Sequence, residues 1–169
     1  MLRTLEPEDA GTAFHVIDAN RECLRRWFPW VDPTTSLDVT REFIERSLAS
    51  ETDLEAIGIW VEGRYAGVIG LSVDPMANGG ELGYWLAEGF EGRGLVTRAC
   101  RELVAHGFGK LGLHRIEIKA APHNARSRAV AERLGFTEEA VLREAGRDAE
   151  RYHDLVVYGL LEDEWRALR

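Results

Sequence analysis

The spacing of apolar residues near the start of the chain is that of helices. Pro7, followed by two acidic residues, resembles a helix start. Beyond it, Phe14, Ile17, Arg21 and Leu24 recur at helical spacing, which places them on one face. These positions predict a first helix that includes both Arg21 and Leu24.

A second helix is expected after Pro33, because Phe43, Ile44 and Leu48 again share one face. Between the two helices lies the aromatic segment Trp27–Trp30. Aromatic side chains mainly fill cores, so this segment is expected to pack in the core or at the edge of a lid rather than to form a binding platform.

Alternation typical of strands begins at Leu54. It predicts a strand that ends at Val61, a second strand over Tyr65–Val73 and a third over Glu81–Ala87. A turn at Glu62 and Gly63 separates the first two strands, and a second turn, marked by Asp74, Pro75, Asn78, Gly79 and Gly80, precedes the third. We therefore expect three consecutive antiparallel strands.

Helical spacing returns after Gly94 and is followed by one more strand. The helical stripe consists of Val96, Ala99, Cys100, Leu103, Phe108 and Leu111. His114–Ala121 then alternates as a strand. Because a helix joins this strand to Glu81–Ala87, the crossover rule predicts that the two run parallel. Cofactor sites of open sheets lie beyond the carboxyl ends of strands, here around Leu86–Gly94.

The remaining elements complete an α/β pattern. A short helix is expected over Asn124–Leu134, with Gly135 as its left-handed cap, and strands over Val141–Glu144 and Asp154–Leu161. The fold class predicted is a single domain over residues 1–169, with a mixed, mostly antiparallel sheet flanked by helices.

Length and charge narrow the classes of function. The 169 residues suit one domain with a sizeable core. The formal net charge of -8 argues against broad binding to nucleic acid or to an anionic membrane, both of which attract a surplus of Lys and Arg. This balance leaves room for a cationic or amine substrate.

The two cysteines, Cys23 and Cys100, are far apart and form no CxxC pair, so neither a disulfide framework nor a metal site is expected. Cys100 falls in the apolar helical stripe, which predicts a role in core packing. The N-terminus is too acidic for a signal peptide and no run approaches membrane-spanning length. A cytoplasmic location is expected.

The turn Gly92, Arg93, Gly94 precedes a predicted helix start. Backbone N–H groups there lack partners and carry the positive end of the helix dipole, so they can hold an anion. Glycines also occur at such turns for purely conformational reasons. A Rossmann fingerprint is excluded, because Thr97 stands where its third glycine belongs, and no GK[ST] of a P-loop follows.

Three segments carry a family resemblance: ELGYWLAEGFEGRGLVTRA, HNARSRAVAERLGF and YHDLVVYGLLEDEW. With the order of elements, they resemble the GCN5-related N-acetyltransferase (GNAT) family, in the branch similar to bacterial enzymes that acetylate ribosomal-protein N-termini. The resemblance implies acetyl-CoA as co-substrate, a primary amine as acceptor, above all the N-terminal amine of a ribosomal protein, and direct attack in a ternary complex. Family precedent also implies a homodimer.

The loop positions at which this family binds the pyrophosphate of acetyl-CoA correspond to Glu91, Gly94 and Val96 in this sequence. Only Gly94 matches the residue type usual in the family. The cofactor would then depend on backbone N–H groups, helped by the charges of Arg93 and Arg98. A backbone N–H near Leu86 would face the oxyanion. The resemblance places cofactor contacts at Leu86, Ala87, Arg93, Gly94, Leu95, Val96, Thr97, Asn124 and Ser127.

Acetyl transfer to an ammonium requires a base that removes a proton, and Glu81 is the first candidate, with Asp154 second. Glu81 can equally be an exposed residue at a strand start. The histidines form no metal or triad spacing, and His123 and His153 are expected to be loop or turn residues.

Many relatives protonate the thiolate with a tyrosine shortly after the Asn124 position, but residues 129–132 contain none. Ser127 matches a serine proposed for that role in the N-terminal acetylating branch. Asn124 and Ser127 can also simply cap a helix. Tyr152 is a second candidate acid or a wall of the substrate pocket.

Two other functions stay open. One is acetylation of a small amine such as a polyamine or an amine-bearing antibiotic. The other is a CoA-binding regulatory module with weak catalysis, motivated by Glu91, Val96 and the missing tyrosine.

Overall fold

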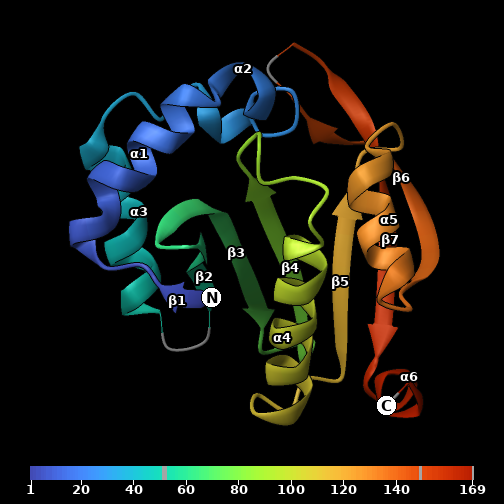
Figure 1. Ribbon diagram of the computed structural model, residues 1–169. Helices are drawn as coiled ribbons and strands as arrows, with labels where there is room; N and C mark the ends of the chain where they lie inside the picture. The colour runs from blue at the N-terminus through green and yellow to red at the C-terminus, as the bar shows by residue number, and fades with distance from the viewer. Residues whose placement is uncertain (51–52, 149, 169) are drawn as a thin grey trace.

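A seven-stranded sheet organises the computed structural model, which describes residues 1–50, 53–148 and 150–168 (Figure 1). Its strand order is β1-β2-β3-β4-β5-β7-β6. Only β4 and β5 pair in parallel, and the other neighbours are antiparallel. The strands are β1 Leu2–Thr4, β2 Leu54–Val61, β3 Arg64–Asp74, β4 Gly79–Leu86, β5 Arg115–Ala120, β6 Thr137–Arg147 and β7 Tyr152–Leu161.

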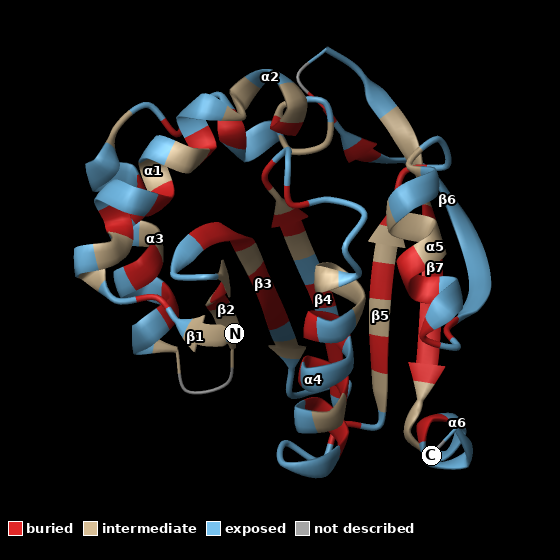
Figure 2. Ribbon diagram, in the orientation of Figure 1, coloured by how far each residue is buried: buried red, intermediate tan, exposed pale blue. Residues whose placement is uncertain are grey.

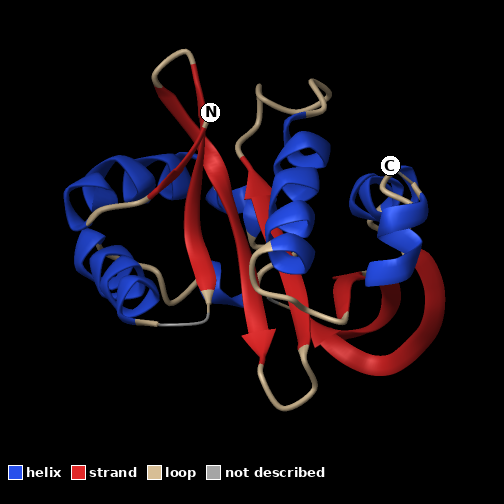
Figure 3. Cartoon of the chain, turned by 90° about the horizontal axis from the view of Figure 1, so that it is seen from below, coloured by secondary structure: helices blue, strands red, loops and turns tan. Residues whose placement is uncertain are grey.

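The helices lie in two groups, one on each side of the sheet (Figure 3). One group comes from the N-terminal part of the chain and the other follows β4 (Figure 1). The first group is η1 Pro7–Asp9, α1 Ala10–Ala19, α2 Arg21–Leu24, η2 Pro29–Val31 and α3 Leu37–Ala49; the second is α4 Leu95–Gly109, α5 Ala125–Arg133 and α6 Glu162–Ala167. The predicted α/β class, with helices around a mixed and mostly antiparallel sheet, is confirmed.

The parallel pairing of β4 with β5 is short. It begins at Gly79 with Arg115 and ends at Leu82 with Ile118. Each strand continues beyond its last partner, β4 as far as Leu86. Since β3 and β7 still pair with their outer edges, the two strands separate into a notch at their carboxyl ends. This notch lies where the crossover argument placed the cofactor site.

The core lies mainly on β3, β4, β5 and β7, whereas β6 is exposed except at Gly146 (Figure 2). The helical stripe on α4 is buried at Ala99, Cys100, Leu103 and Phe108. The core role predicted for Cys100 is therefore confirmed, while Leu111 lies beyond the helix end and is exposed.

The first predicted helix is wrong in one respect, because it breaks at Asn20 into α1 and α2. Asn20 leaves helical geometry, with φ -112° and ψ 12°. Its side-chain amide donates to the Val16 carbonyl at 2.7 Å, and its side-chain oxygen accepts the Glu88 N–H at 2.9 Å. The long-range hydrogen bond with Glu88, 68 positions away, therefore stabilises a break at Asn20 in place of a continuous helix.

Other differences are at the ends of elements. Leu48 was expected to face inward but is exposed, since α3 buries Ile44 instead. β1 and α6 were not predicted, and β6 and β7 are longer than expected. Gly135, with φ +85°, closes α5 in the left-handed conformation as predicted.

Leu160→Ala tests the position of the core. Leu160 on β7 is fully buried opposite Ile116, so truncation removes apolar contacts and leaves a cavity. We expect a loss of about 2–5 kcal/mol in the free energy of unfolding, measured in urea. Leu142→Ala on β6 is the matched control, because Leu142 is 43% exposed and should change stability by less than about 0.5 kcal/mol. Equal losses would contradict this core.

Candidate functional site

The loop between β4 and α4 has the geometry of an anion cradle. Gly92 and Gly94 both adopt positive φ, +73° and +67°, and Gly94 is the N-cap of α4. Arg98 turns back and donates to the Arg93 carbonyl at 3.0 Å. The first-turn N–H groups of α4, which begins at Leu95, therefore follow a glycine turn as predicted, and the left-handed conformation of that turn is a finding of the structure. Val96 and Thr97 lie in that first turn.

Glu91 does not stand alone beside this cradle. Its carboxylate forms an ion pair with the guanidinium of Arg126 on α5. Repulsion of a phosphate by Glu91 is therefore opposed by a neighbouring positive charge. The same pair connects the loop to the first turn of α5, 35 residues away.

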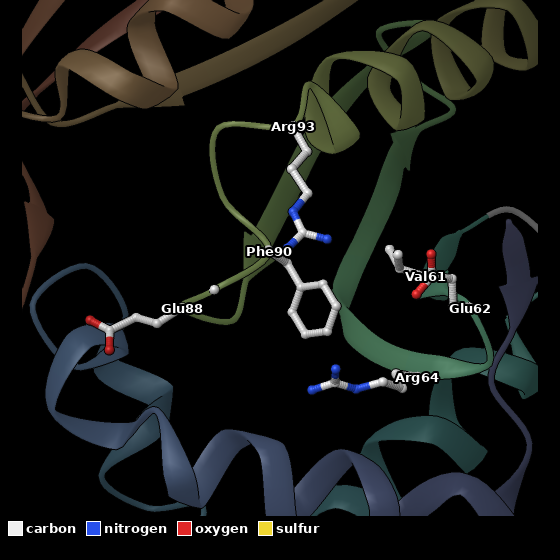
Figure 4. Close-up of a pocket in the computed structure, with 7 residues that line it drawn as sticks. Val61, Glu62, Arg64, Glu88, Phe90 and Arg93 are labelled. Carbon is white, nitrogen blue, oxygen red and sulfur yellow. The ribbon is translucent and has the colours of Figure 1, made fainter.

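Two further guanidinium groups, of Arg64 and Arg93, lie near Phe90 of this loop (Figure 4). The Arg64 and Arg93 guanidinium carbons lie 5.2 and 5.7 Å from the centre of the Phe90 ring. Figure 4 shows both groups reaching toward the ring while the Glu88 side chain points away. These residues line a small cleft of about 90 Å³. Glu62 and Glu88 also line this cleft, so charges of both signs border it, with the two arginines at the Phe90 ring.

Asn124 and Ser127 have separate roles at the start of α5. Asn124 is the N-cap, and its side-chain oxygen accepts the backbone N–H of Ser127 at 3.1 Å. The Ser127 hydroxyl instead lies 2.9 Å from the Tyr84 hydroxyl on β4. The capping role expected of Asn124 is present, whereas the Ser127 side chain is not part of the cap.

Sequence reasoning missed Tyr84. Its hydroxyl also lies 3.3 Å from the Ser127 backbone carbonyl, so it can donate to either oxygen. Burial raises the pKa of Tyr84 well above its usual value, so the phenol stays protonated at neutral pH. Period-two alternation put Tyr84 on the same face as Leu82, but no local pattern shows a contact across 43 residues. β4 therefore supplies a tyrosine hydroxyl that α5 lacks.

Glu81 lies in a row of charges on the sheet. Its carboxylate is 2.7 Å from the Lys119 ammonium, which is 3.5 Å from Glu117. Arg115 continues the row, at 2.7 Å from Glu117 and 2.6 Å from Glu139. The hydrogen bond that the Lys119 ammonium donates to Glu81 raises the pKa of Lys119. Glu81 is thus ion-paired as well as exposed.

The other predicted residues are dispersed. Tyr152 begins β7, is 63% exposed and lies beneath the Arg147 guanidinium at 5.7 Å. The Asp154 carboxylate accepts the Glu144 backbone N–H at 2.9 Å. Leu86 is half-buried at the end of β4. The Ala87 N–H donates to the Ala66 carbonyl at 2.8 Å, so that group is already committed to the sheet.

Aromatic rings form a cover at the open end of the notch. Trp27, between α2 and η2, stacks on His123 with ring centres 5.2 Å apart, and His123 meets His153 edge-on at 5.8 Å. Trp30 lies 6.3 Å from Trp85 on β4. This arrangement agrees with the lid-edge interpretation of the aromatic segment. The position of His123 in a loop is confirmed, whereas His153 lies in β7 and not in a turn.

The described residues contain no group of three or more His, Cys, Asp or Glu that could hold a metal ion. Within the same part of the chain, no helix is both long and apolar enough to cross a membrane.

Residues 1–137 match the family defined as acetyltransferase (GNAT) domain. The chain belongs to the GNAT family. A Bacillus subtilis (strain 168) protein named "Putative ribosomal N-acetyltransferase YdaF" is 40% identical to this GNAT protein over 169 residues, covering 97% of the chain and 92% of the relative.

Two solved structures agree with this assignment. One is the RimL ribosomal L7/L12 alpha-N-protein acetyltransferase in complex with coenzyme A, with a TM-score of 0.90 and 26% sequence identity. The superposition covers 96% of this chain and 94% of the RimL chain. The microcin C7 self immunity acetyltransferase MccE, in complex with acetyl-CoA and AMP, gives a TM-score of 0.87 at 28% identity, over 95% and 91%. This GNAT protein is an N-acetyltransferase related to ribosomal-protein acetyltransferases.

Arg126→Ala tests whether the ion pair protects the cradle. It leaves Glu91 unbalanced near the α4 N-terminus, where a negative charge competes with a bound phosphate. We expect the KM for acetyl-CoA to rise about two- to fivefold at low salt and less at high salt, in steady-state assays. Adding Glu91→Gln should restore the wild-type KM. An unchanged KM in Arg126→Ala at low salt would show that the pair has no such role.

Proposed function

We propose that this GNAT protein acetylates the N-terminal amine of a protein, with a ribosomal protein as the first candidate. The observation that supports this acceptor is the 40% identity, over nearly the whole of both chains, to a protein named as a ribosomal N-acetyltransferase. The structural likeness to an L7/L12 alpha-N-protein acetyltransferase supports the same class. In this proposal residues 1–169 act as one catalytic domain in the cytoplasm, as a homodimer.

The residues of the notch fit coenzyme A. Beyond Leu82, the β4 edge that paired with β5 is free of that partner and can receive the amide groups of a pantetheine arm. The glycine turn at Gly94 and the first-turn N–H groups of α4 suit a pyrophosphate. Arg93 and Arg98 add charge beside them. Acetyl-CoA supplies the activated acetyl thioester there.

Among the residues predicted to move protons, Ser127 has the best-defined surroundings. It lies in the first turn of α5, and its hydroxyl is held by Tyr84 on β4, the strand that forms one side of the notch. A hydroxyl held in this way suits donation to a departing thiolate, and Tyr84 suits support of the serine oxygen. Glu81 and Tyr152 stay predictions as base and second acid.

A small amine is the second candidate acceptor. MccE, at 28% identity, was solved with AMP, which shows that this fold also accommodates a small molecule. Thiol release from acetyl-CoA should be measured with peptides that carry free N-terminal serine, alanine or methionine, and with spermidine. Faster turnover of a peptide supports the proposal, and faster turnover of spermidine overturns it. Absence of turnover throughout would favour a CoA-binding regulatory module.

Ser127→Ala separates catalysis from helix capping. The variant keeps the backbone N–H that bonds Asn124 but loses the hydroxyl beside Tyr84. We expect turnover to fall about 10²-fold or more with little change in acetyl-CoA KM or melting temperature.

Asn124→Ala is the matched control, because it removes the cap and should lower stability by about 1 kcal/mol. If Ser127→Ala loses stability and activity in parallel, as a lost cap would, the hydroxyl is not the acid.

A further inference from the structure

Three rings from distant parts of the chain meet at the open end of the notch. Trp27 comes from the N-terminal helical segment, His123 from the loop between β5 and α5, and His153 from β7. The rings are stacked at 5.2 Å and edge-on at 5.8 Å. His123 directly precedes Asn124, the N-cap of α5, so the group adjoins the helix start that carries Ser127.

His153 lies just past the carboxyl end of β5. The last pair between β5 and β7 is Ala120 with Val156, and β7 runs antiparallel to β5. His153 is three residues before Val156 on β7, and so lies on the open side of that pair. Its ring packs over Gly146 of β6, where any Cβ would collide with it. The imidazole is therefore held in place beside the notch.

The hydrogen bond of His153 assigns its tautomer. Nδ1 lies 2.9 Å from the Asp154 backbone carbonyl, which can only accept a hydrogen bond. Nδ1 therefore carries the hydrogen, and in the neutral ring Nε2 carries a lone pair. The hydrogen bond made by one ring nitrogen is the usual means by which a protein sets which of the two imidazole nitrogens carries the lone pair.

Nε2 of His153 is buried and has no hydrogen-bond partner among the described residues. A buried acceptor without a partner costs free energy, and such an atom usually has a functional reason. The two carboxylates considered as bases are engaged: Glu81 pairs with Lys119, and Asp154 accepts the Glu144 N–H. His153 thus offers a proton-accepting atom that no neighbour uses.

We propose that Nε2 of His153 accepts the proton of the acceptor ammonium before that amine attacks the acetyl group. This inference rests on the proposed acetyl transfer to an amine. The nitrogen loses two protons in all: one passes to His153 and then to solvent. As the C–N bond forms and the C–S bond breaks, the other ends on the thiol. Trp27 and His123 form the wall against which the acceptor lies.

Several charged and titratable groups lie near this ring. They are His123 in the loop before α5, Asp148 in the β6–β7 hairpin, Tyr152 and Asp154 beside it on β7, and Arg147 on β6.

Asp148 is the negative charge that matters most for the protonated ring. Hydrogen bonds from the Glu150 and Arg151 N–H groups hold its pKa below the usual value, and positive charge on His153 adds to that effect. Asp148 therefore stays ionised beside the ring.

His153→Gln tests the proposal in the full-length protein with acetyl-CoA and a peptide bearing a free N-terminal serine. Glutamine can accept a hydrogen bond but cannot take the proton. We expect kcat/KM to fall about 10²-fold or more, and the acidic limb of its pH profile to disappear, while acetyl-CoA KM changes little. In His153→Ala, added imidazole should restore part of the rate. His106→Gln, on the exposed part of α4, is the matched control and should keep the wild-type profile.

A wild-type pH profile in His153→Gln overturns the proposal, as does loss of the acidic limb in Glu81→Gln alone, which would assign the base to Glu81. A separate measurement does not depend on the acceptor. Nitrogen chemical shifts of the imidazole should show hydrogen on Nδ1 and a lone pair on Nε2. Hydrogen on Nε2 of the neutral ring overturns the role of His153, whereas failure of every acceptor with the expected tautomer counts only against the proposed function.

Discussion

The short parallel pairing between β4 and β5 is the constraint on which the site depends. Four residue pairs hold the two strands together before they separate. The separation leaves one edge of β4 open, points the loop after Leu86 toward α4, and sets the α5 start opposite Tyr84. A longer ladder would close the notch, and no ladder would leave the two halves of the sheet unconnected. The site is thus a controlled interruption of an otherwise continuous sheet.

Charge is distributed unevenly around that notch. The loop end is bordered by Arg64, Arg93 and Arg126, while the strands below it carry Glu81 with Lys119. The hydroxyls of Tyr84 and Ser127 and the imidazole of His153 also lie beside the notch. Ionised and hydrogen-bonding groups therefore both border the notch, and arginines lie at its loop end, where an anionic co-substrate is favoured.

Local sequence patterns predicted the elements that form the notch, because β4, β5 and α4 each bury one regular face. The glycine turn before α4 and the cap at Asn124 are also local features, so the sequence predicted them. What escaped prediction was long-range: the contacts of Tyr84 with Ser127 and of Trp27 with His123 join segments with no shared period. β1 and α6 were missed because three and six residues are too few to show a period.

Asn20 has a consequence beyond the break in the first helix. Its side chain holds the Glu88 N–H, and so ties the segment that carries Trp27 to the loop that carries Gly94. A ligand that stabilises one of these two segments therefore also stabilises the other, and such coupling is reciprocal. If the loop becomes more rigid when the nucleotide end of the co-substrate is seated, the aromatic cover becomes more rigid with it. This one amide thereby links binding of the donor to binding of the acceptor, by the same factor whichever of them enters first.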